Sequence, residues 1–310
     1  MLSNFLRKIL SLLSFWFVND LSYIKSKDKK ILKIIEKKLN GIHFNKKHLK
    51  KTHNIFNKKI FDLLKKEKLT NFLRENFIQK IFFVHNRLFI LKELLELKKD
   101  KNWILYKKLI EEDNVGNPIR YFLYPKSSGN RINHVYHLSV LTKTFNINLK
   151  KLNNVFEFGG GYGCMARIFS KINKRTTYKC FGTNIINLLQ YYYLKQNNLD
   201  VGFTKKNKIR LISDVKKINT RYSNSLFIAN WSLSETPVNF RKKFIKSIKN
   251  SKLIIISFQE SFENINNLKY FKNLKKNLEK KFEIKIIKNE FYKGNFLKKQ
   301  QQFFFIFEIK

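Results

Sequence analysis

A glycine-rich segment is the part of this sequence best suited to chemistry. Val155-Phe-Glu-Phe158 predicts a buried strand, Gly159-Gly-Gly-Tyr-Gly163 follows it, and a helical pattern begins near Met165. A strand, a glycine loop and a helix in this order are typical of a nucleotide-binding loop. Glycine lets the backbone turn tightly and approach a ligand closely, and the helix N-terminus offers free N–H groups. A glycine turn without a ligand is the less favoured interpretation.

The spacing of the glycines separates two kinds of nucleotide site. A dinucleotide fingerprint that starts at Gly159 and Gly161 requires a third glycine at position 164, which is Cys164. The loop instead reads Glu-x-Gly-x-Gly-x-Gly from Glu157 to Gly163, which resembles the first motif of class I methyltransferases. In that motif the acidic residue helps to hold the methionine ammonium and the glycines make room for the methionine and ribose. The resemblance implies that S-adenosyl-L-methionine binds to Glu157, Gly159, Gly160, Gly161, Tyr162 and Gly163.

The segments around this loop predict a sheet of mostly parallel strands. Strand-like runs alternate with helical ones at Asn154–Phe158, Thr176–Phe181, Ile209–Ser213, Ser225–Asn230 and Leu253–Phe258. Such alternation implies helices on both faces of a parallel sheet. Two final runs, Phe282–Lys288 and Gln302–Ile309, have no helix long enough between them for a parallel crossover, so they should pair antiparallel. We therefore predict an α/β, Rossmann-like class I methyltransferase fold with a seven-stranded sheet and a terminal antiparallel hairpin.

The chain before this sheet reads as helical. Apolar residues recur at three-to-four spacing in three stripes that are most simply explained as core, with lysines on the other faces. Turn-forming residues at 112–118 include the first proline, Pro118, and mark a junction. We predict a helical N-terminal region at residues 1–115 and a class I methyltransferase domain at residues 116–310.

Several later segments together resemble the sugar O-methyltransferase family of bacteria, over roughly residues 115–296. The pieces that match are Val115-Gly-Asn-Pro118, Phe156–Gly163, Leu188-Leu-Gln-Tyr-Tyr-Tyr-Leu194, Trp231-Ser-Leu-Ser-Glu235, Phe258-Gln259, Asn267, Tyr270-Phe271 and Lys293-Gly-Asn295. The glycine motif is specific to the superfamily, whereas Ser-Leu-Ser-Glu is the piece that points to this family. The resemblance implies methyl transfer to a hydroxyl of a sugar or glycan precursor, as in polysaccharide biosynthesis.

One segment departs from the family pattern. The family usually has an Asp-Leu-Pro turn after the second strand, where this chain has Gly182-Thr183-Asn184. A carboxylate there would accept hydrogen bonds from the ribose hydroxyls, and the amide oxygen of Asn184 would do so more weakly. A degenerate, non-catalytic Rossmann-fold binding protein therefore remains an alternative. Asp214, at the end of the third strand, is an adenine contact by position, or equally a loop carboxylate facing water.

The end of the fourth strand holds the candidate catalytic residues. In a class I fold this edge lies beside the transferable methyl group, so we expect Asn230 and Trp231 to contact the cofactor. Substrate contacts are expected from Ser232, Ser234 and Gln259. Methyl transfer to an alcohol needs an aligned oxygen and removal of a weakly acidic proton. Glu235 is the candidate base, and a helix-capping role for it is weighed equally.

Two histidines precede the first strand of the sheet. His134 and His137 lie three residues apart, on one helical face of a segment that we expect to fold over the cofactor. Either imidazole could act as the base or orient a hydroxyl, although a structural role is the better interpretation of each taken alone. We assign no role to His43, His48, His53 and His85.

The charge of the chain bears on its partners. The 310 residues carry a formal net charge of +42, with a pI near 10.1, which would favour nucleic acid or an anionic membrane. Nearly all of this charge is lysine, and the chain is also rich in Asn, Ile and Phe, which share A- and T-rich codons. We therefore favour composition bias over a polyanion groove, which would favour arginine. An RNA methyltransferase and a methyltransferase that acts on another small hydroxylated metabolite remain alternatives to the sugar enzyme.

The cysteines and the N-terminus bear on location. Cys164 and Cys180 are the only cysteines and form no metal-binding motif, so we expect a reduced cytoplasmic setting, no disulfide and no metal site. The apolar run 9–18 is too short to span a bilayer, and no cleavage site follows it. We favour a helix that packs on the protein itself over contact of residues 1–20 with the inner face of a membrane.

Overall fold

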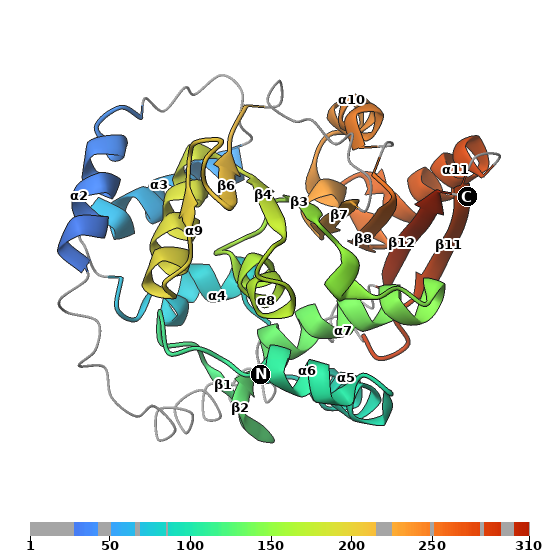
Figure 1. Ribbon diagram of the computed structural model, residues 1–310. Coiled ribbons are helices and arrows are strands. Elements are labelled where there is room, and N and C mark those ends of the chain that lie inside the picture. The colour runs from blue at the N-terminus through green and yellow to red at the C-terminus, as the bar shows by residue number, and fades with distance from the viewer. Residues whose placement is uncertain are drawn as a thin grey trace, which may run out of the picture.

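The structure is a computed structural model, which describes residues 28–42, 51–65, 69–84, 86–214, 225–248, 251–279, 282–292 and 301–309 (Figure 1). The predictions for residues 1–20, for Lys293-Gly-Asn295 and for His43, His48 and His85 lie outside these ranges. So does the side chain of His53. No helix in the described part of the chain is both long and apolar enough to cross a membrane.

An eight-stranded sheet forms the centre of the molecule, in the order β11-β12-β8-β7-β3-β4-β6-β5. All seven predicted strands are present, and the sequence did not predict the short β5. Strand β12 pairs antiparallel with both β11 and β8, and the other pairs are parallel. The strands are β3 (Asn154–Phe158), β4 (Thr177–Phe181), β5 (Val201–Gly202), β6 (Ile209–Ile212), β7 (Ser225–Asn230), β8 (Leu253–Gln259), β11 (Phe282–Lys288) and β12 (Gln302–Ile309).

This strand order is that of a Rossmann-like class I methyltransferase fold, as predicted. The chain starts the sheet in its middle at β3, adds β4 and β6 on one side, and then crosses to β7 and β8 on the other. The order therefore reverses between β3 and β7. In open α/β sheets, ligands bind beyond the carboxyl ends of the strands at such a switch point.

Residue alternation along the strands gives the sheet two apolar faces. Val155, Ile228 and Ile255 belong to one buried cluster, whereas Phe156 and Phe227 belong to another. The first face is covered by α7 (Gly129–Phe145), α8 (Cys164–Ile172) and α9 (Asn184–Gln196). The second is covered by α10 (Val238–Ile248) and α11 (Asn267–Leu278), as Figure 1 shows. Because Glu157 shares the face of Val155, its side chain lies on the α7–α9 side.

The N-terminal helices pack on the α7–α9 side, and the helical prediction for this region is confirmed. They are α2 (Asp28–Leu39), α3 (Lys51–Lys65), α4 (Asn76–Phe82), α5 (Leu88–Lys99) and α6 (Trp103–Ile110). The sequence also predicted that one apolar stripe, Phe77, Ile78, Ile81, Leu88, Leu91 and Leu95, packs in the core. This prediction was wrong in part, because the stripe runs over α4 and α5 and the break between them changes the buried face. Leu88 is 80% exposed, while Phe89 and Ile90 are buried.

A buried ionic cluster fixes the start of α7. Nη2 of Arg131 lies 2.6 Å from Oε1 of Glu112 and 2.9 Å from Oδ2 of Asp113, and the Arg131 side chain is fully buried. Arg167 on α8 bonds the same Asp113 through Nε and Nη2. The residues after α6 are thereby tied to both α7 and α8. Short elements complete the fold: β1 (Arg120–Tyr121), β2 (Tyr124–Ser128), β9 (Ser261–Phe262), β10 (Ile265–Asn266), and the 3₁₀ turns Phe72–Arg74, Leu149–Lys151 and Leu233–Glu235.

Candidate functional site

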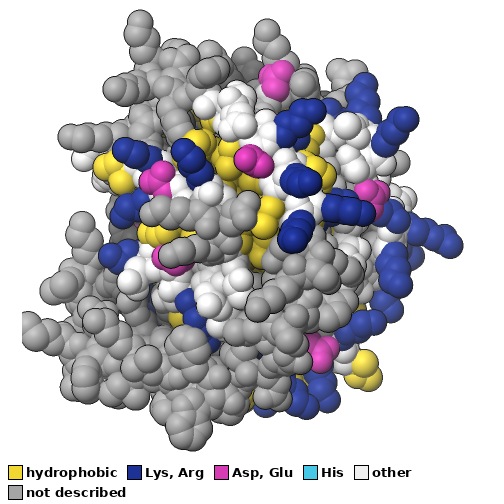
Figure 2. All heavy atoms as spheres, turned by 90° about the vertical axis from the view of Figure 1, so that its left-hand side faces the viewer, with side chains coloured by type: hydrophobic (Ala, Val, Ile, Leu, Met, Phe, Trp, Pro, Cys, Tyr) yellow, Lys and Arg dark blue, Asp and Glu magenta, His cyan; other side chains and the backbone are white. Residues whose placement is uncertain are grey.

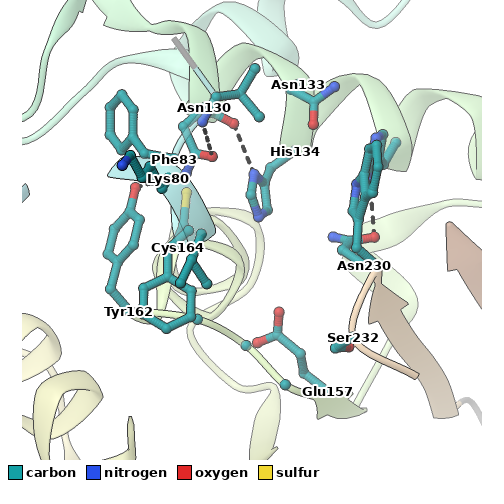
Figure 3. Close-up of a pocket in the computed structure, with 18 of the residues that line it drawn as sticks. Lys80, Phe83, Asn130, Asn133, His134, Glu157, Tyr162, Cys164, Asn230 and Ser232 are labelled. Carbon is teal, nitrogen blue, oxygen red and sulfur yellow. Dashed lines mark hydrogen bonds between the residues drawn. The ribbon is translucent and has the colours of Figure 1, made fainter. Parts of the chain in front are cut away.

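A cavity of about 310 Å³ opens at the switch point of the sheet. Its wall is formed by the ends of β3 and β7, the glycine loop, α7, and a stretch of the N-terminal region from residue 80 to residue 89 (Figure 3). The volume falls at the lower end of the range of small-molecule sites. This is the cavity that the position of the glycine loop leads one to expect.

The glycine loop adopts backbone conformations that need glycine. Gly159, Gly161 and Gly163 have φ of +68°, +54° and +103°, a region that other residues rarely adopt. A Cβ at Gly159 would also collide with the Ser232 side chain. Residues 159–162 line the cavity as predicted, whereas Gly163 lies under Leu194 at the start of α8 and does not.

Glu157 is a buried carboxylate that faces the cavity (Figure 3). It accepts a hydrogen bond from the Tyr178 hydroxyl at 2.9 Å and a weaker one from the Cys180 thiol at 3.9 Å. No basic side chain of the described residues forms an ion pair with it. Burial raises the pKa of Glu157 to about 7, despite these two hydrogen bonds. A cationic group of a ligand would satisfy this carboxylate.

The end of β7 contributes three of the predicted residues. Asn230, Trp231 and Ser232 all line the cavity. Trp231 has φ of +65°, and its ring lies 5.3 Å from the ring of Tyr292. Ser232 donates its hydroxyl hydrogen to the carbonyl oxygen of Phe158, so that hydroxyl helps to hold the loop in place.

Glu235 lines the same cavity from the turn after β7. Its Oε1 accepts a hydrogen bond from Nε2 of Gln259 at 3.3 Å, and burial raises its pKa to about 7. No hydrogen bond joins this carboxylate to the backbone of α10 within the described residues, so the geometry gives no support to a capping role. Ser234 and Gln259 do not line the cavity: they are buried behind Glu235 and bond each other at 3.1 Å.

Both predicted histidines reach the cavity from α7. His134 Nδ1 lies 2.8 Å from the Asn130 carbonyl oxygen. His137 Nδ1 lies 3.2 Å from Asn230 Oδ1, and its Nε2 lies 3.3 Å from Gln302 Nε2. Burial lowers the pKa of His134 to about 4 and that of His137 to about 3, so both rings are neutral near pH 7. Groups with such low pKa values are weak bases, and both nitrogens of His137 are already engaged.

The two residues predicted for the ribose and adenine lie outside the cavity lining. Asn184 is exposed at the first position of α9, and Asp214 is exposed after β6. Thr183 instead caps α9, and its hydroxyl bonds Asn57 of α3 at 3.3 Å. The N-terminal region therefore covers the end of β4, where the family carries its acidic residue.

Several residues in the cavity wall were not predicted from the sequence. They come from the N-terminal region and from the segment after β11: Lys80, Ile81, Phe82, Phe83, Val84, Arg87, Phe89 and Tyr292. Phe82 lies over Gly161, within 3.3 Å of where a Cβ would be. The apolar residues among them follow a pattern that indicates core and not a site, and Lys80 and Arg87 do not differ from the many other basic residues of the chain. In the part of the chain that the structure describes, no three His, Cys, Asp or Glu side chains gather as metal ligands.

Comparison with known proteins gives distant likenesses only. No protein family and no curated protein matches the chain. Among solved structures, the methyltransferase domain of bacterial CtHen1 is 10% identical with a TM-score of 0.43, over 57% of this chain and 97% of that one. The small RNA methyltransferase HEN1 is 10% identical with a TM-score of 0.41, over 57% of this chain and 25% of that one.

A third likeness is to precorrin-6y C5,15-methyltransferase from Geobacter metallireducens. It is 11% identical with a TM-score of 0.35, over 57% of this chain and 87% of that one. At such identities and scores, none of these proteins identifies a substrate or a reaction for this chain.

Proposed function

We propose that this chain is an S-adenosylmethionine-dependent methyltransferase that acts on a hydroxyl of a sugar or glycan precursor. The observation that carries the proposal is Glu157, a buried carboxylate beside the glycine loop that lacks a cationic partner among the described residues and faces the cavity. The cofactor has an ammonium and a sulfonium, and either cation is suited to such a carboxylate.

The residues present fit the methionine end of the cofactor. Glu157 would hold the ammonium, and Gly159, Gly160 and Gly161 line the cavity beside it. When bound, the cofactor supplies a methyl group on a positively charged sulfur. The ribose end has no matching carboxylate, because Gly182-Thr183-Asn184 stands there and Asn184 lies outside the lining. We therefore expect weaker cofactor binding than in relatives that carry an acid at this position.

The acceptor side of the cavity suits an alcohol. Glu235 is a buried carboxylate with a pKa of about 7, so near neutral pH a large fraction of it is ionised and can take a hydroxyl proton. Trp231 and Tyr292 form an aromatic wall nearby, and apolar ring faces are surfaces on which sugar rings can pack. The sugar class itself rests on the resemblance of Trp231–Glu235 and the other segments to the sugar family.

Calorimetry with S-adenosylhomocysteine and with NAD tests the cofactor. We expect binding of the first and none of the second. The acceptor is tested by transfer of labelled methyl groups to panels of nucleotide sugars, glycan fragments and structured RNA. Transfer to RNA alone would replace the sugar proposal by the RNA alternative. Cofactor binding without transfer to any panel would favour the non-catalytic alternative.

A further inference from the structure

One polar atom of the cavity has no partner in the structure. Asn230 Oδ1 accepts hydrogen bonds from His137 at 3.2 Å and from Ser257 Oγ at 3.3 Å. The amide nitrogen Nδ2 of Asn230 is buried and has no hydrogen-bond partner among the described residues. Figure 3 shows this nitrogen pointing toward the cavity. Buried donors are almost always paired, so an unpaired one facing a cavity indicates an acceptor atom on a ligand.

The orientation of this amide follows from a chain of buried groups that begins at a backbone N–H. The N–H of Phe291 can only donate, and it lies 3.1 Å from Asn289 Oδ1. Nδ2 of Asn289 therefore faces Gln302 Oε1 at 2.8 Å, and it also contacts the Glu93 carboxylate at 3.3 Å. With its oxygen thus engaged, Gln302 must turn its NH₂ group toward His137.

The tautomer of His137 is then determined. Gln302 Nε2 donates to His137 Nε2, so that ring nitrogen must carry a lone pair and the neutral ring must carry its hydrogen on Nδ1. The Nδ1–H donates to Asn230 Oδ1. Each group in the chain thus donates to the next one toward the cavity, and the last donor, Nδ2 of Asn230, is left for the ligand.

Glu157 offers the opposite chemistry on the neighbouring strand. Strands β3 and β7 are paired in parallel, with Glu157 opposite Ile228, so Asn230 lies two residues further along β7. Paired strands lie about 5 Å apart and two residues along a strand add about 6.6 Å, so the Cα atoms of Glu157 and Asn230 are about 8 Å apart. An acceptor carboxylate and a donor amide at this separation suit a zwitterion, in which an ammonium and a carboxylate share one carbon atom.

We propose that Nδ2 of Asn230 donates a hydrogen bond to the α-carboxylate of the cofactor's methionine end, and that His137 is the positioning residue that holds Asn230 in this orientation. The inference rests on the proposed function. It narrows the cofactor contact expected of Asn230 to the carboxylate of the cofactor. It also gives His137 a positioning role in place of the expected role as the base. The hydroxyl of the methyl acceptor is a second group that could accept a hydrogen bond from Nδ2 of Asn230. Calorimetry with two ligands distinguishes this hydroxyl from the carboxylate.

Calorimetry with S-adenosylmethionine and its decarboxylated analogue tests the proposal, because the two ligands differ in the carboxylate alone. Asn230→Asp keeps the shape of the side chain and replaces the donor by an acceptor. We expect Asn230→Asp to weaken the binding of S-adenosylmethionine about tenfold or more, as is usual for loss of a hydrogen bond to a charged group. The affinity for the decarboxylated analogue should stay unchanged. The proposal is overturned if Asn230→Asp weakens the binding of both ligands equally, or weakens the binding of neither. In the latter case Nδ2 of Asn230 is the donor to the acceptor hydroxyl instead.

Two variants of His137 test the positioning role. Asn in place of His137 keeps an N–H near the position of Nδ1, so His137→Asn should retain affinity for S-adenosylmethionine, whereas His137→Leu should lose it several-fold. Equal affinity in the two variants contradicts the positioning role. If wild-type protein binds neither ligand, the proposed function fails, and the inference fails with it.

A spectroscopic measurement on the wild-type protein requires no variant to fold. Nitrogen-15 NMR of the histidine rings should show a neutral ring with its hydrogen on Nδ1 for His137. A ring protonated on Nε2, or a cationic ring at neutral pH, would reverse the direction of the chain and overturn the proposal.

Discussion

Nε2 of Gln259, at the end of β8, donates a hydrogen bond to Oε1 of Glu235 across 3.3 Å. This bond holds the Glu235 carboxylate at the cavity wall, while Gln259 itself is buried behind it. Gln259, which we expected from the sequence to contact the substrate, therefore supports the carboxylate of Glu235, and Glu235 is the residue that lines the cavity. Removing the carboxylate and removing its support should have different consequences.

Glu235→Gln should lower the rate of methyl transfer by about a hundred to ten thousand fold, which is the usual range for general-base assistance. Cofactor affinity should stay unchanged, because the amide keeps the shape of the side chain. With a pKa of about 7, the wild-type rate should rise with pH through this value, since the base must be ionised. Initial rates at several pH values check both expectations. The exposed Glu283 provides the control variant Glu283→Gln, which should match wild type.

A structural role for Glu235 would give another pattern. The Glu235→Gln protein would then lose stability, and the folded fraction would turn over at the wild-type rate. Gln259→Leu removes the supporting hydrogen bond and leaves the carboxylate, so it should lower the rate less than Glu235→Gln does. A rate independent of pH between about 6 and 8 would contradict the role of Glu235 as the base.

Cofactor binding should depend on the ionisation of Glu157. Burial raises its pKa to about 7, so below this value the carboxyl is protonated and cannot pair with an ammonium. Affinity for S-adenosylmethionine should therefore be lower at pH 6 than at pH 8, with proton release on binding near pH 7. Calorimetry in two buffers of different ionisation enthalpy measures that release. Glu157→Gln should bind weakly at every pH, and a pH-dependent affinity in this variant would assign the effect to another group.

The sheet was predictable because its strands are short apolar runs separated by helical or polar segments. The end of β3 and the glycines after it could be placed from residue types alone, since few contexts put Glu157 and Gly159–Gly163 between a strand and a helix. The hairpin of β11 and β12 followed from the length of the connection. Strand β5 was missed because it pairs over only two residues at the edge of the sheet, which is too short for a strand pattern in the sequence.

The site was harder to predict, because its wall comes from distant parts of the chain. Phe82 and Arg87 follow the same apolar and basic patterns as core and surface helices, and only the packing of the N-terminal region against the glycine loop brings them to the cavity. The support of Asn230 by His137 depends on Gln302, which is 165 residues from His137 along the chain. No local spacing reveals such a contact. Asn184, which was placed by analogy with the family, lies outside the cavity lining, and Asn57 of α3 bonds Thr183 beside it.

Arg131 should be important for stability. Its side chain is fully buried and pairs with Glu112 and Asp113. Arg131→Met would leave the buried Glu112 carboxylate without its ion-pair partner, while Asp113 would keep Arg167, and loss of such a buried partner typically costs about 3 to 5 kcal/mol. Urea unfolding measures this change. Lys285, which pairs with Glu283 at 3.2 Å while 47% and 51% of the two side chains are exposed, is the control, and Lys285→Met should cost less than about 1 kcal/mol. Equal costs would show that the buried cluster contributes no more than a surface pair.

Nucleic-acid binding should be weak and sensitive to salt. On the face shown in Figure 2, Lys and Arg side chains of the described part lie at several places between hydrophobic and acidic ones, and a run of them follows the right-hand edge. Scattered lysines release counterions on binding, so affinity should fall steeply as salt rises from about 50 to 200 mM, with no preference among sequences. A gel-shift titration at the two salt concentrations checks this. Selective binding to a structured RNA at the higher salt would instead favour the RNA methyltransferase alternative.

Glu93 is a fully buried carboxyl that accepts hydrogen bonds from Asn133 and Asn289. Burial raises its pKa from 4.5 to about 8. The folded state therefore retains a proton that the unfolded chain releases above about pH 4.5. This contribution to the free energy of unfolding is fully present below that pH and is lost as the pH rises toward 8.

Two other groups overlap with this effect at lower pH. The lowered pKa values of His134 and His137 make stability rise with pH up to about 6.5, where the unfolded histidines lose their protons. Above that pH the histidines no longer contribute, and only the buried carboxyls with raised pKa values still change their protonation on unfolding. The free energy of unfolding should therefore fall between pH 6.5 and 8, with up to about 2 kcal/mol of the fall due to Glu93. Glu93→Gln has no proton to lose, and urea unfolding at both pH values should show a smaller fall for it. An identical fall in the two proteins would mean that Glu93 is ionised throughout this range and that its charge is stabilised by Asn133 and Asn289.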